Sequence, residues 1–243
     1  MKAKMVEWLK GEIKAAGMQG CVFGLSGGVD SAVVAGLCKQ AFPANVLGLI
    51  MPCHSNPQDA IDAQKFADKF AIPTKTIDLA SSFDELYKTL SGQPYDKKTM
   101  DLSIANLKPR LRMLTLYYYA NKQNYLVVGT GNKSESVMGY CTKYGDAGVD
   151  LLPLAALLKT QVRELAKELG VPQEIIDKAP SAGLWQGQTD EGEMGITYAE
   201  LDKIIVALEN GDFAGLDPKK VDLVKQKMAQ NEHKRCLPPS FMI

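Results

Sequence analysis

Short apolar runs alternate with amphipathic stretches over the first half of the chain. The apolar runs predict four short strands, at residues 21–25, 45–51, 74–79 and 125–130. Between them, apolar positions spaced three or four residues apart predict helices, at residues 29–41, 57–70, 81–90 and 101–121. Strands that alternate with helices form parallel sheets covered on both faces. We therefore predict an α/β fold with a doubly wound parallel sheet and helices on both of its faces.

The remainder of the chain has a mostly helical pattern. One helix is predicted within residues 1–17, and four more in the C-terminal third, at residues 155–169, 173–178, 198–208 and 219–231. Ser82 and Glu85 have the spacing of a capping box for the helix at 81–90. No internal repeat, low-complexity tract or linker interrupts the sequence. We expect one domain over residues 1–243, with a helical C-terminal third.

Composition and charge disfavour several kinds of partner. Lys plus Arg and Asp plus Glu both total 28, whereas a protein that binds nucleic acid or a membrane surface usually has a basic excess. The five cysteines form no CxxC pair, which is typical of free thiols in a reducing compartment. The chain opens with no secretory signal, and no apolar run reaches the ~20 residues of a membrane helix. We expect a cytoplasmic protein with neither nucleic acid nor a membrane as partner.

The segment GLSGGVDS, at residues 24–31 after the first strand, carries the strongest chemical signal. Its glycines permit close backbone approach, and the helix that follows offers unpaired N–H groups, which favour phosphate. The segment has neither a Walker A pattern nor GxGxxG. Asp30 adds negative charge beside the expected anion, a conflict that a divalent cation would resolve. The alternative is a tight turn in which Asp30 only caps the helix.

A second glycine-rich segment, GTGNKSE at residues 129–135, follows the fourth predicted strand. Ligands of open parallel sheets bind beyond the carboxyl ends of the strands. Both segments fall at such ends, so we expect them to face one site. This shared placement is a stronger indication of function than either segment alone.

The SGGVDS segment resembles the pyrophosphate-binding loop of the N-type ATP pyrophosphatases, which cleave ATP between its α and β phosphates. Further segments make residues 20–235 similar to the NAD synthetases; in chain order they are KPRLRM, GTGNKSE, GYCTKYGDAGVDLLPL, LLKTQVRELA, KAPSAGLWQGQTDEGEMGITYAELD and EHKR. The resemblance implies an adenine nucleotide alpha hydrolase-like fold. It also implies a magnesium-dependent ligase that forms a C–N bond. Such an enzyme adenylates deamido-NAD with ATP, and ammonia then gives NAD, AMP and pyrophosphate.

The ammonia-dependent members are the more similar branch. Glutamine-using members carry an additional amidase domain, for which 243 residues leave no room. However, GTGNKSE stands where ammonia-dependent enzymes often have GTDHAAE, and it is similar to the glutamine-using branch. The source of ammonia, free or delivered by a separate protein, therefore stays open. Members are usually homodimers, and the resemblance extends this expectation to the present chain.

The resemblance also implies roles for individual residues. Asp30 and Glu135 would hold magnesium, and catalysis would depend on Asp30, Lys159 and Asp150. Because Asp150 is a carboxylate in a glycine-containing loop beside the expected substrate, our own hypothesis is that it attracts ammonium and accepts its proton. ATP would be bound by the first loop and three later residues: Gly24, Leu25, Ser26, Gly27, Gly28, Val29, Asp30, Ser31, Thr130, Lys159 and Ser181. The dinucleotide would be contacted by Arg110, Lys143, Asp150, His233 and Lys234.

Simpler explanations exist for several of these residues when each is taken alone. Glu135 reads as a solvated acid at a helix start, and EHKR as a basic helix end. Sequence alone does not separate Asp146 from Asp150. The closest alternative function is another adenylating enzyme with the same loop, such as a GMP synthetase or a tRNA-thiolation enzyme. A second alternative is a nucleotide sensor, against which the retained acidic pair of Asp30 and Glu135 speaks.

Overall fold

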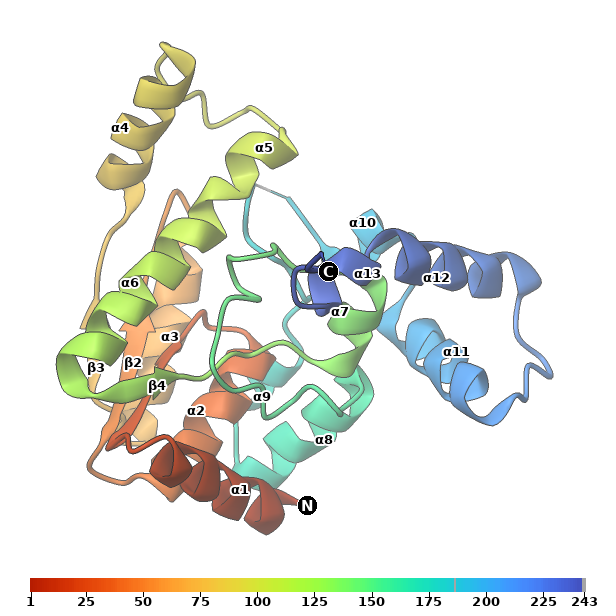
Figure 1. Cartoon of the computed structure of the whole chain (residues 1–243), viewed down its shortest axis with the longest axis horizontal. Helices are drawn as coiled ribbons and strands as arrows, with labels where there is room; N and C mark the ends of the chain where they lie inside the picture. Colours follow the sequence, from red (N-terminus) through yellow and green to blue (C-terminus); the bar gives the residue numbers. More distant parts are fainter. Residues whose placement is uncertain (186, 242–243) are drawn as a thin grey trace.

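The computed structural model describes residues 1–185 and 187–241. Within these residues the four strands form one parallel sheet in the order β3-β2-β1-β4 (Figure 1). The strands are β1 (Gly20–Gly24), β2 (Val46–Ile50), β3 (Thr74–Thr76) and β4 (Tyr125–Val127). The chain builds outward from β1 to β3 and then crosses to β4 on the other side of β1. The predicted doubly wound sheet is confirmed, and its topological switch point lies between β1 and β4.

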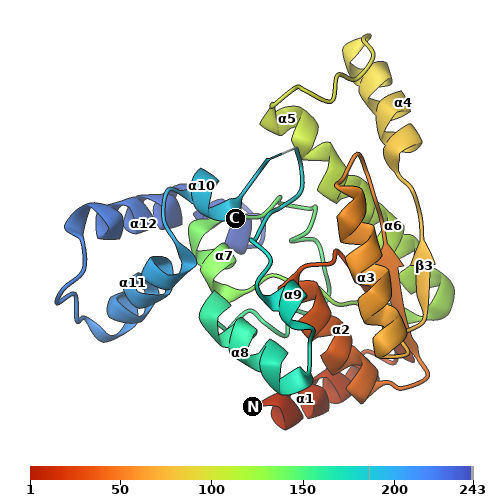
Figure 2. The ribbon, with the colours of Figure 1, turned by 180° about the vertical axis from the view of Figure 1, so that it is seen from behind.

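Helices cover both faces of the sheet, as predicted (Figures 1 and 2). One face carries α1 (Lys2–Ala15), α2 (Val29–Ala41), α3 (Pro57–Lys69) and α8 (Lys159–Leu169). The opposite face carries α4 (Ala80–Ser91) and α6 (Leu107–Gln123), which follows the short α5 (Leu102–Ala105). Leu9, Val33 and Phe66 are buried in the first layer, and each such side chain stabilises the fold by about 1.5–3 kcal/mol.

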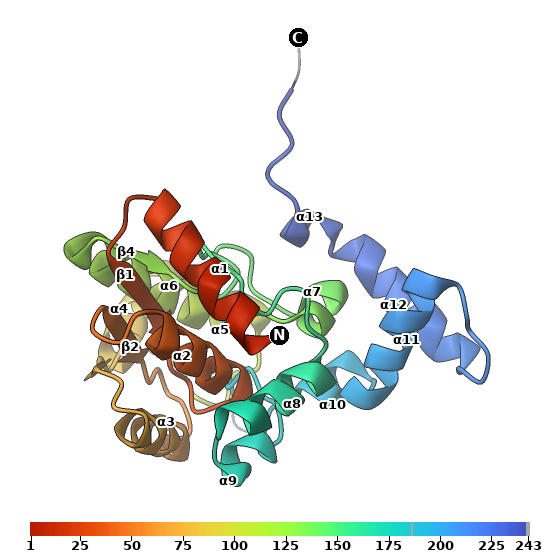
Figure 3. The ribbon, with the colours of Figure 1, turned by 90° about the horizontal axis from the view of Figure 1, so that it is seen from below.

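The C-terminal third forms a helical lobe beside the sheet (Figure 3). It contains α10 (Asp190–Met194), α11 (Tyr198–Asn210), α12 (Pro218–Gln230) and α13 (Glu232–Arg235), which pack with α7 (Lys133–Met138), whereas α9 (Gln173–Ile176) packs on α8 in the first layer. Leu201, Ile204 and Val224 are buried at its centre. Since α11 packs on both α7 and α8, the lobe is fastened to the elements that follow β4. None of the helices in the described ranges is long and apolar enough to cross a membrane.

Several predicted boundaries differ from the structure for local reasons. The helix predicted at 155–169 begins at Lys159, where the side chain of Gln161 accepts the N–H of Leu158, the residue before the first turn. The capping box predicted at Ser82 is wrong, because α4 begins two residues earlier, at Ala80. The helix predicted at 101–121 is divided into α5 and α6. Sequence patterns therefore located these helices but not their first residues.

Candidate active site

A cavity of about 650 Å³ lies beyond the carboxyl ends of the central strands. Its walls come from the loop after β1, the end of β2, the start of α6, the segments at 128–130 and 139–146, the start of α8, and the segment at 178–184. Both glycine-rich segments of the sequence line it, as predicted. This is the position that the switch point of a doubly wound sheet provides for a ligand.

The first glycine-rich loop is held open by two serines. The N–H of Ser26 donates to Ser31 Oγ at 3.2 Å, and Ser31 Oγ donates to the carbonyl of Gly28 at 2.9 Å. Gly27 has φ +80°, and a Cβ there would lie 2.4 Å from the carbonyl oxygen of Asp59, so α3 can approach this loop only at a glycine. Helix α2 begins after Gly28 with no side chain capping its N-terminus. The loop thus keeps the N–H groups of a helix start available for an anion.

Asp30 does not cap its own helix. Gly28 is the N-cap of α2, and the Asp30 side chain reaches across to α7 and α8. Its Oδ1 accepts from Asn132 Nδ2 at 2.8 Å, and its Oδ2 lies 2.5 Å from Lys159 Nζ. The interpretation of Asp30 as a simple helix cap is therefore wrong.

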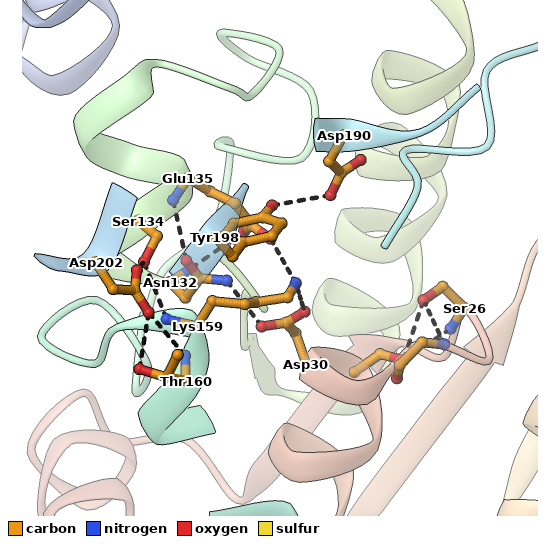
Figure 4. A network of polar contacts seen from close by, with 12 residues as sticks. Ser26, Asp30, Asn132, Ser134, Glu135, Lys159, Thr160, Asp190, Tyr198 and Asp202 are labelled. Atoms are coloured by element: carbon orange, nitrogen blue, oxygen red, sulfur yellow. Dashed lines mark hydrogen bonds and ion pairs between the residues drawn. The ribbon is translucent and has the colours of Figure 1, made fainter. Parts of the chain in front are cut away.

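Lys159 joins the two acidic residues of the predicted site (Figure 4). Besides Asp30, its Nζ contacts Glu135 Oε1 at 3.1 Å. The Lys159 side chain is only 3% exposed, and Nζ lies 4.9 Å from the centre of the Tyr198 ring. Asp30, Glu135 and Lys159, which are far apart in sequence, thus meet at the floor of the cavity.

Burial and neighbouring charges shift the pKa values of Glu135 and Lys159. Burial raises the pKa of Glu135 from 4.5 to about 7, an effect that the ammonium of Lys159 opposes and the carboxylate of Asp30 strengthens. Burial alone would lower the pKa of Lys159, but Asp30 and Glu135 outweigh it and hold that pKa above its ordinary value. Lys159 therefore stays protonated in this site, while burial increases the proton affinity of Glu135.

A further carboxylate, that of Asp202, fixes the backbone from which Lys159 projects (Figure 4). Asp202 of α11 accepts the N–H of Thr160 at 2.9 Å and its hydroxyl at 2.8 Å. Asp202 also accepts from Ser134 Oγ, which in turn accepts the N–H of Lys159 at 2.9 Å. An anion at a helix N-terminus is stabilising. This arrangement sets the first turn of α8 and the direction of the Lys159 side chain.

Asp190 and Tyr198 close the cluster on the side of the helical lobe. The hydroxyl of Tyr198 donates to Asp190 Oδ2 at 2.9 Å, and both residues are buried. Asp190 Oδ1 is buried without a hydrogen-bond partner among the described residues. Burial raises the pKa of Asp190. The floor of the cavity thus contains three carboxyl groups around one lysine.

The remaining residues predicted for ATP also lie at the cavity. Thr130 is at the end of the segment after β4, and Ser181 lies in the segment that crosses the opposite wall. The Oγ of Ser181 accepts the N–H of Gly183 at 3.1 Å. Seven residues of the first loop line the cavity as well: Gly24, Leu25, Ser26, Gly28, Val29, Asp30 and Ser31. Gly27 supports this loop from behind, against α3.

The residues predicted for the dinucleotide are more scattered. Lys234 lines the cavity, and its Nζ donates to the carbonyls of Gly139 and Cys141 at 2.7 and 3.0 Å. Lys143, Arg110 and His233 are not among the described residues that line it. They lie at the surface, where Lys143 donates to the carbonyl of His233 and Arg110 donates to the carbonyl of Lys143. The structure therefore gathers these three side chains outside the main cavity.

Asp150 and Asp146, which sequence could not separate, have different surroundings. Asp150 Oδ1 accepts from the Tyr117 hydroxyl at 3.0 Å, and its Oδ2 accepts the N–H of Val127 at 2.8 Å, so this side chain fastens the end of β4. Asp146 lines the cavity and accepts the N–H of Thr142. Desolvation by the surrounding protein raises the pKa of Asp146, although its side chain opens into the cavity. Of the two, Asp146 is the one that lines the cavity.

Besides Asp190, sequence reasoning missed four residues that shape the site. Asn132 contacts both acids, Tyr198 lies against Lys159, and Asp202 fixes α8, as described above. The fourth is Arg112, which lines the cavity and donates to the carbonyl of Met51 at 3.1 Å. The sequence does contain one indication of Asn132. Asn132 and Glu135 have the spacing of a capping box, which the structure forms at the start of α7.

The side chains at the cavity floor could supply only a few ligands to a metal ion. Within residues 1–185 and 187–241, no cluster of three or more His, Cys, Asp or Glu side chains is arranged to hold a metal ion. Two carboxylates, Asp30 and Glu135, do converge on one cation, the ammonium of Lys159. The helix start above them favours phosphate. The cavity is therefore suited to an anionic ligand that lies next to the cluster of Asp30, Glu135 and Lys159.

Known proteins match this chain over nearly its full length. The family model for NAD synthase matches residues 1–238. An NH(3)-dependent NAD(+) synthetase from Finegoldia magna is 48% identical over 237 residues, covering 98% of this chain and 93% of the relative. The solved NMN synthetase from Francisella tularensis has a TM-score of 0.88 at 39% identity, covering 99% of this chain and 97% of that one. The solved NH3-dependent NAD synthetase from Campylobacter jejuni has a TM-score of 0.83 at 33% identity, with the same two coverages. This chain belongs to the NAD synthase family.

Proposed function

We propose that this protein is a ligase that converts deamido-NAD, ATP and ammonia into NAD, AMP and pyrophosphate. The observation that carries the proposal is the convergence of Asp30, Glu135 and Lys159 beneath the GLSGGVDS loop, in a cavity at the switch point of the sheet. Membership of the NAD synthase family supports the same reaction. A nucleotide sensor would need the phosphate loop but not the acidic pair.

The chemistry proceeds in two displacements. A carboxylate oxygen of the nicotinate group attacks the α-phosphorus of ATP, pyrophosphate leaves, and an acyl adenylate forms. Ammonia then attacks the acyl carbon, and AMP leaves with the oxygen that made the bond. Activation is needed because hydroxide is a poor leaving group, whereas AMP is a good one. The protein contributes mainly position and charge.

The phosphate side of the cavity supplies that charge. The N–H groups at the start of α2 cradle phosphate oxygens, and Lys159 offsets the charge that develops on the departing pyrophosphate. Thr130 and Ser181 offer hydroxyls from two walls of the cavity. Removal of one preorganised donor of this kind typically costs about 10²–10³-fold in kcat.

Magnesium fits the acidic pair. Mg²⁺ is usually bound through one or two carboxylates together with substrate phosphates, and Asp30 and Glu135 already converge on a single cationic atom. These two residues would hold the ion at the edge of the phosphate loop. When bound, magnesium neutralises phosphate charge. Asn132 holds both carboxylates in place for that role, because it donates to one oxygen of each.

Ammonium must lose a proton before it can attack. Asp146 is the carboxylate that supports this step, since it opens into the cavity and its pKa is raised above the ordinary value. Asp150 has both oxygens engaged by Tyr117 and Val127 and serves to fasten the loop. The dinucleotide side is then formed by Lys234 at the cavity, with Arg110, Lys143 and His233 at its outer margin.

We infer a homodimer in the cytoplasm, with α6 at the subunit contact. Leu114 and Tyr118 lie one turn apart on α6 and are 64% and 57% exposed. Exposed apolar side chains gathered on one helix face are typical of protein interfaces. The mass measured by light scattering should be twice the 26.5 kDa of the chain. A monomer at micromolar concentration contradicts this assignment.

One observation favours nicotinic acid mononucleotide as a second substrate for amidation. The neighbour from Francisella tularensis is named an NMN synthetase, and it is 39% identical to this chain. An enzyme of that name makes the mononucleotide amide, so nicotinic acid mononucleotide is the natural competitor of deamido-NAD. The two acceptors differ by an adenylate group, which only the dinucleotide can place at the outer margin of the cavity.

One assay tests the function and the acceptor together. Purified protein, ATP, magnesium and ammonium are mixed with either deamido-NAD or nicotinic acid mononucleotide, and the amide product and AMP are measured by chromatography. We expect NAD and AMP in equal amounts, with a higher kcat/KM for the dinucleotide. Glutamine in place of ammonium should give no product with this chain alone. Formation of ADP, or no amide from either acceptor, contradicts the proposal.

A further inference from the structure

The two acidic residues proposed for magnesium have no free oxygen in this structure (Figure 4). Asp30 Oδ1 accepts from Asn132 Nδ2 at 2.8 Å, and Oδ2 accepts from Lys159 Nζ at 2.5 Å. Glu135 Oε1 accepts from Lys159 Nζ at 3.1 Å, and Oε2 accepts the N–H of Asn132 at 3.3 Å. Every oxygen that could ligate a metal is thus already hydrogen-bonded to this chain.

The N–H donors of Lys159 also have partners within the protein. An ammonium group has three N–H donors. Two of them are directed to Asp30 and Glu135, and Nζ also lies 4.9 Å from the centre of the Tyr198 ring. The side chain is 3% exposed, so water contributes little. The ammonium therefore lies between the two carboxylates, where a shared metal ion would lie.

We propose that Lys159 occupies the cation position of the nucleotide-free enzyme and excludes free divalent metal, so that metal enters only together with ATP. The proposal rests on the proposed function, since it assumes that ATP and a divalent metal use this cavity. In it, the phosphates of ATP draw the ammonium away from Asp30 and Glu135 and release their oxygens.

The energetics favour this order of events. A free divalent ion would have to displace two charge-assisted hydrogen bonds and lie beside the ammonium it displaced. Mg²⁺ also gives up its water reluctantly. ATP changes both conditions, because its phosphates offer Lys159 a new anionic partner and offer the metal additional ligands. In the nucleotide-free enzyme, Lys159 thus makes the acidic pair selective for a metal–nucleotide complex.

The test measures metal binding and needs no turnover. Mn²⁺ alone is titrated into the full-length protein, and free Mn²⁺ is followed by electron paramagnetic resonance, with no nucleotide, dinucleotide or ammonium present. Lys159→Met keeps the length of the side chain and removes its charge. We expect this variant to gain one saturable site that is tighter than any site in the wild type by on the order of 100-fold. Equal affinity in the two proteins, or no site in the variant, overturns the proposal.

Two further variants test whether the gained Mn²⁺ site is formed by Asp30 and Glu135. Lys108 is a buried lysine that forms no ion pair with any described residue and donates to the carbonyl of Leu184 at 2.6 Å. Lys108→Met removes the same charge elsewhere and should bind Mn²⁺ as the wild type does. The double variant Lys159→Met, Asp30→Asn should lose the new site. A new site in Lys108→Met, or one that persists in the double variant, contradicts the assignment to Asp30 and Glu135.

The wild type provides a measurement that does not depend on any variant folding. Its thermal midpoint should be unchanged by millimolar Mn²⁺ alone and should rise when Mn²⁺ is added with a non-cleavable α,β-methylene analogue of ATP. A rise with Mn²⁺ alone overturns the proposal. If NAD is formed while free Mn²⁺ binds tightly, this inference alone fails. If Mn²⁺ behaves as expected while no amide is formed, the proposed function fails.

Discussion

The phosphate side and the dinucleotide side of the cavity are constructed differently. On the phosphate side, Asp30, Glu135 and Lys159 belong to one buried network in which each charge contacts another. On the dinucleotide side, Lys143 and Arg110 are at the surface, and their partners are backbone carbonyls. A buried, fully connected network fixes its geometry before any ligand arrives. Surface side chains bound only to carbonyls can turn toward a ligand at little cost.

This difference predicts that substitutions on the two sides have different consequences. Changes in the buried network should affect chemistry and folding together, because its members support one another. Changes on the outer side should affect the apparent affinity for the dinucleotide and leave the fold unchanged. The four changes below test this contrast, beginning with the largest expected effect.

Asp30→Asn should lower kcat/KM by about 10²–10³-fold. The amide keeps the shape of the side chain but removes the charge that contacts Lys159 and the oxygen expected to face magnesium. Steady-state kinetics at saturating magnesium measure the effect, and thermal unfolding verifies the fold. Asp222→Asn, on the exposed face of α12, is the matched control and should behave as wild type. A loss of less than tenfold in Asp30→Asn would remove this residue from the mechanism.

Glu135 should make stability depend on pH between about 4.5 and about 7. Burial raises its pKa from 4.5 to about 7, so in this window the folded protein holds a proton that the unfolded chain has released. The free energy of unfolding should therefore fall as pH rises, by at most about 3 kcal/mol over the window. Urea denaturation of metal-free protein measures it, and Glu135→Gln should lack this slope. Identical slopes in both proteins contradict the assignment.

Gly27→Ala should destabilise the protein by about 1–3 kcal/mol. The residue has φ +80°, and a Cβ would lie 2.4 Å from the carbonyl oxygen of Asp59. Gly17→Ala is the matched control, since it shares the positive φ of +71° but meets no atom within 4 Å. Urea unfolding should give a larger loss at Gly27, accompanied by weaker ATP binding. Equal losses at both glycines would mean that the contact with α3 does not constrain the loop.

Lys143→Ala should change the free energy of unfolding by no more than about 0.5 kcal/mol. Among the described residues, its Nζ donates to the carbonyl of His233 alone, and it lies over the Tyr144 ring. The KM for deamido-NAD should rise while the KM for ATP stays constant. A loss of stability comparable to that of Gly27→Ala would instead place Lys143 in the rigid part of the site.

Local sequence patterns predicted the elements that depend on local physics. The small apolar residues of α2 gave its range at 29–41, and the glycines before it gave the phosphate loop. The apolar runs gave the strands, although β4 ends earlier than predicted, at Val127, where the chain leaves the sheet after a single bridge from Val128 to Leu151. These features are encoded within a few residues of where they occur.

Contacts between distant segments could not be predicted in this way. Asn132 lies 102 residues from Asp30, and Asp202 lies 42 residues from Thr160, so nothing near either residue indicates its partner. The difference between Asp146 and Asp150 depends on the path of one loop, which places one carboxylate in the cavity and the other against β4. The family resemblance indicated that Asp30, Glu135 and Lys159 share a site, but their mutual contacts required the structure.

The most direct test of the proposed function follows one oxygen atom. Deamido-NAD labelled with oxygen-18 in its nicotinate carboxylate is converted with ATP and ammonium, and the products are analysed by mass spectrometry. Attack of the carboxylate on the α-phosphorus predicts one labelled oxygen in each AMP and none in pyrophosphate. Label in pyrophosphate or inorganic phosphate, or AMP without label, would contradict an acyl adenylate and with it the account of this site.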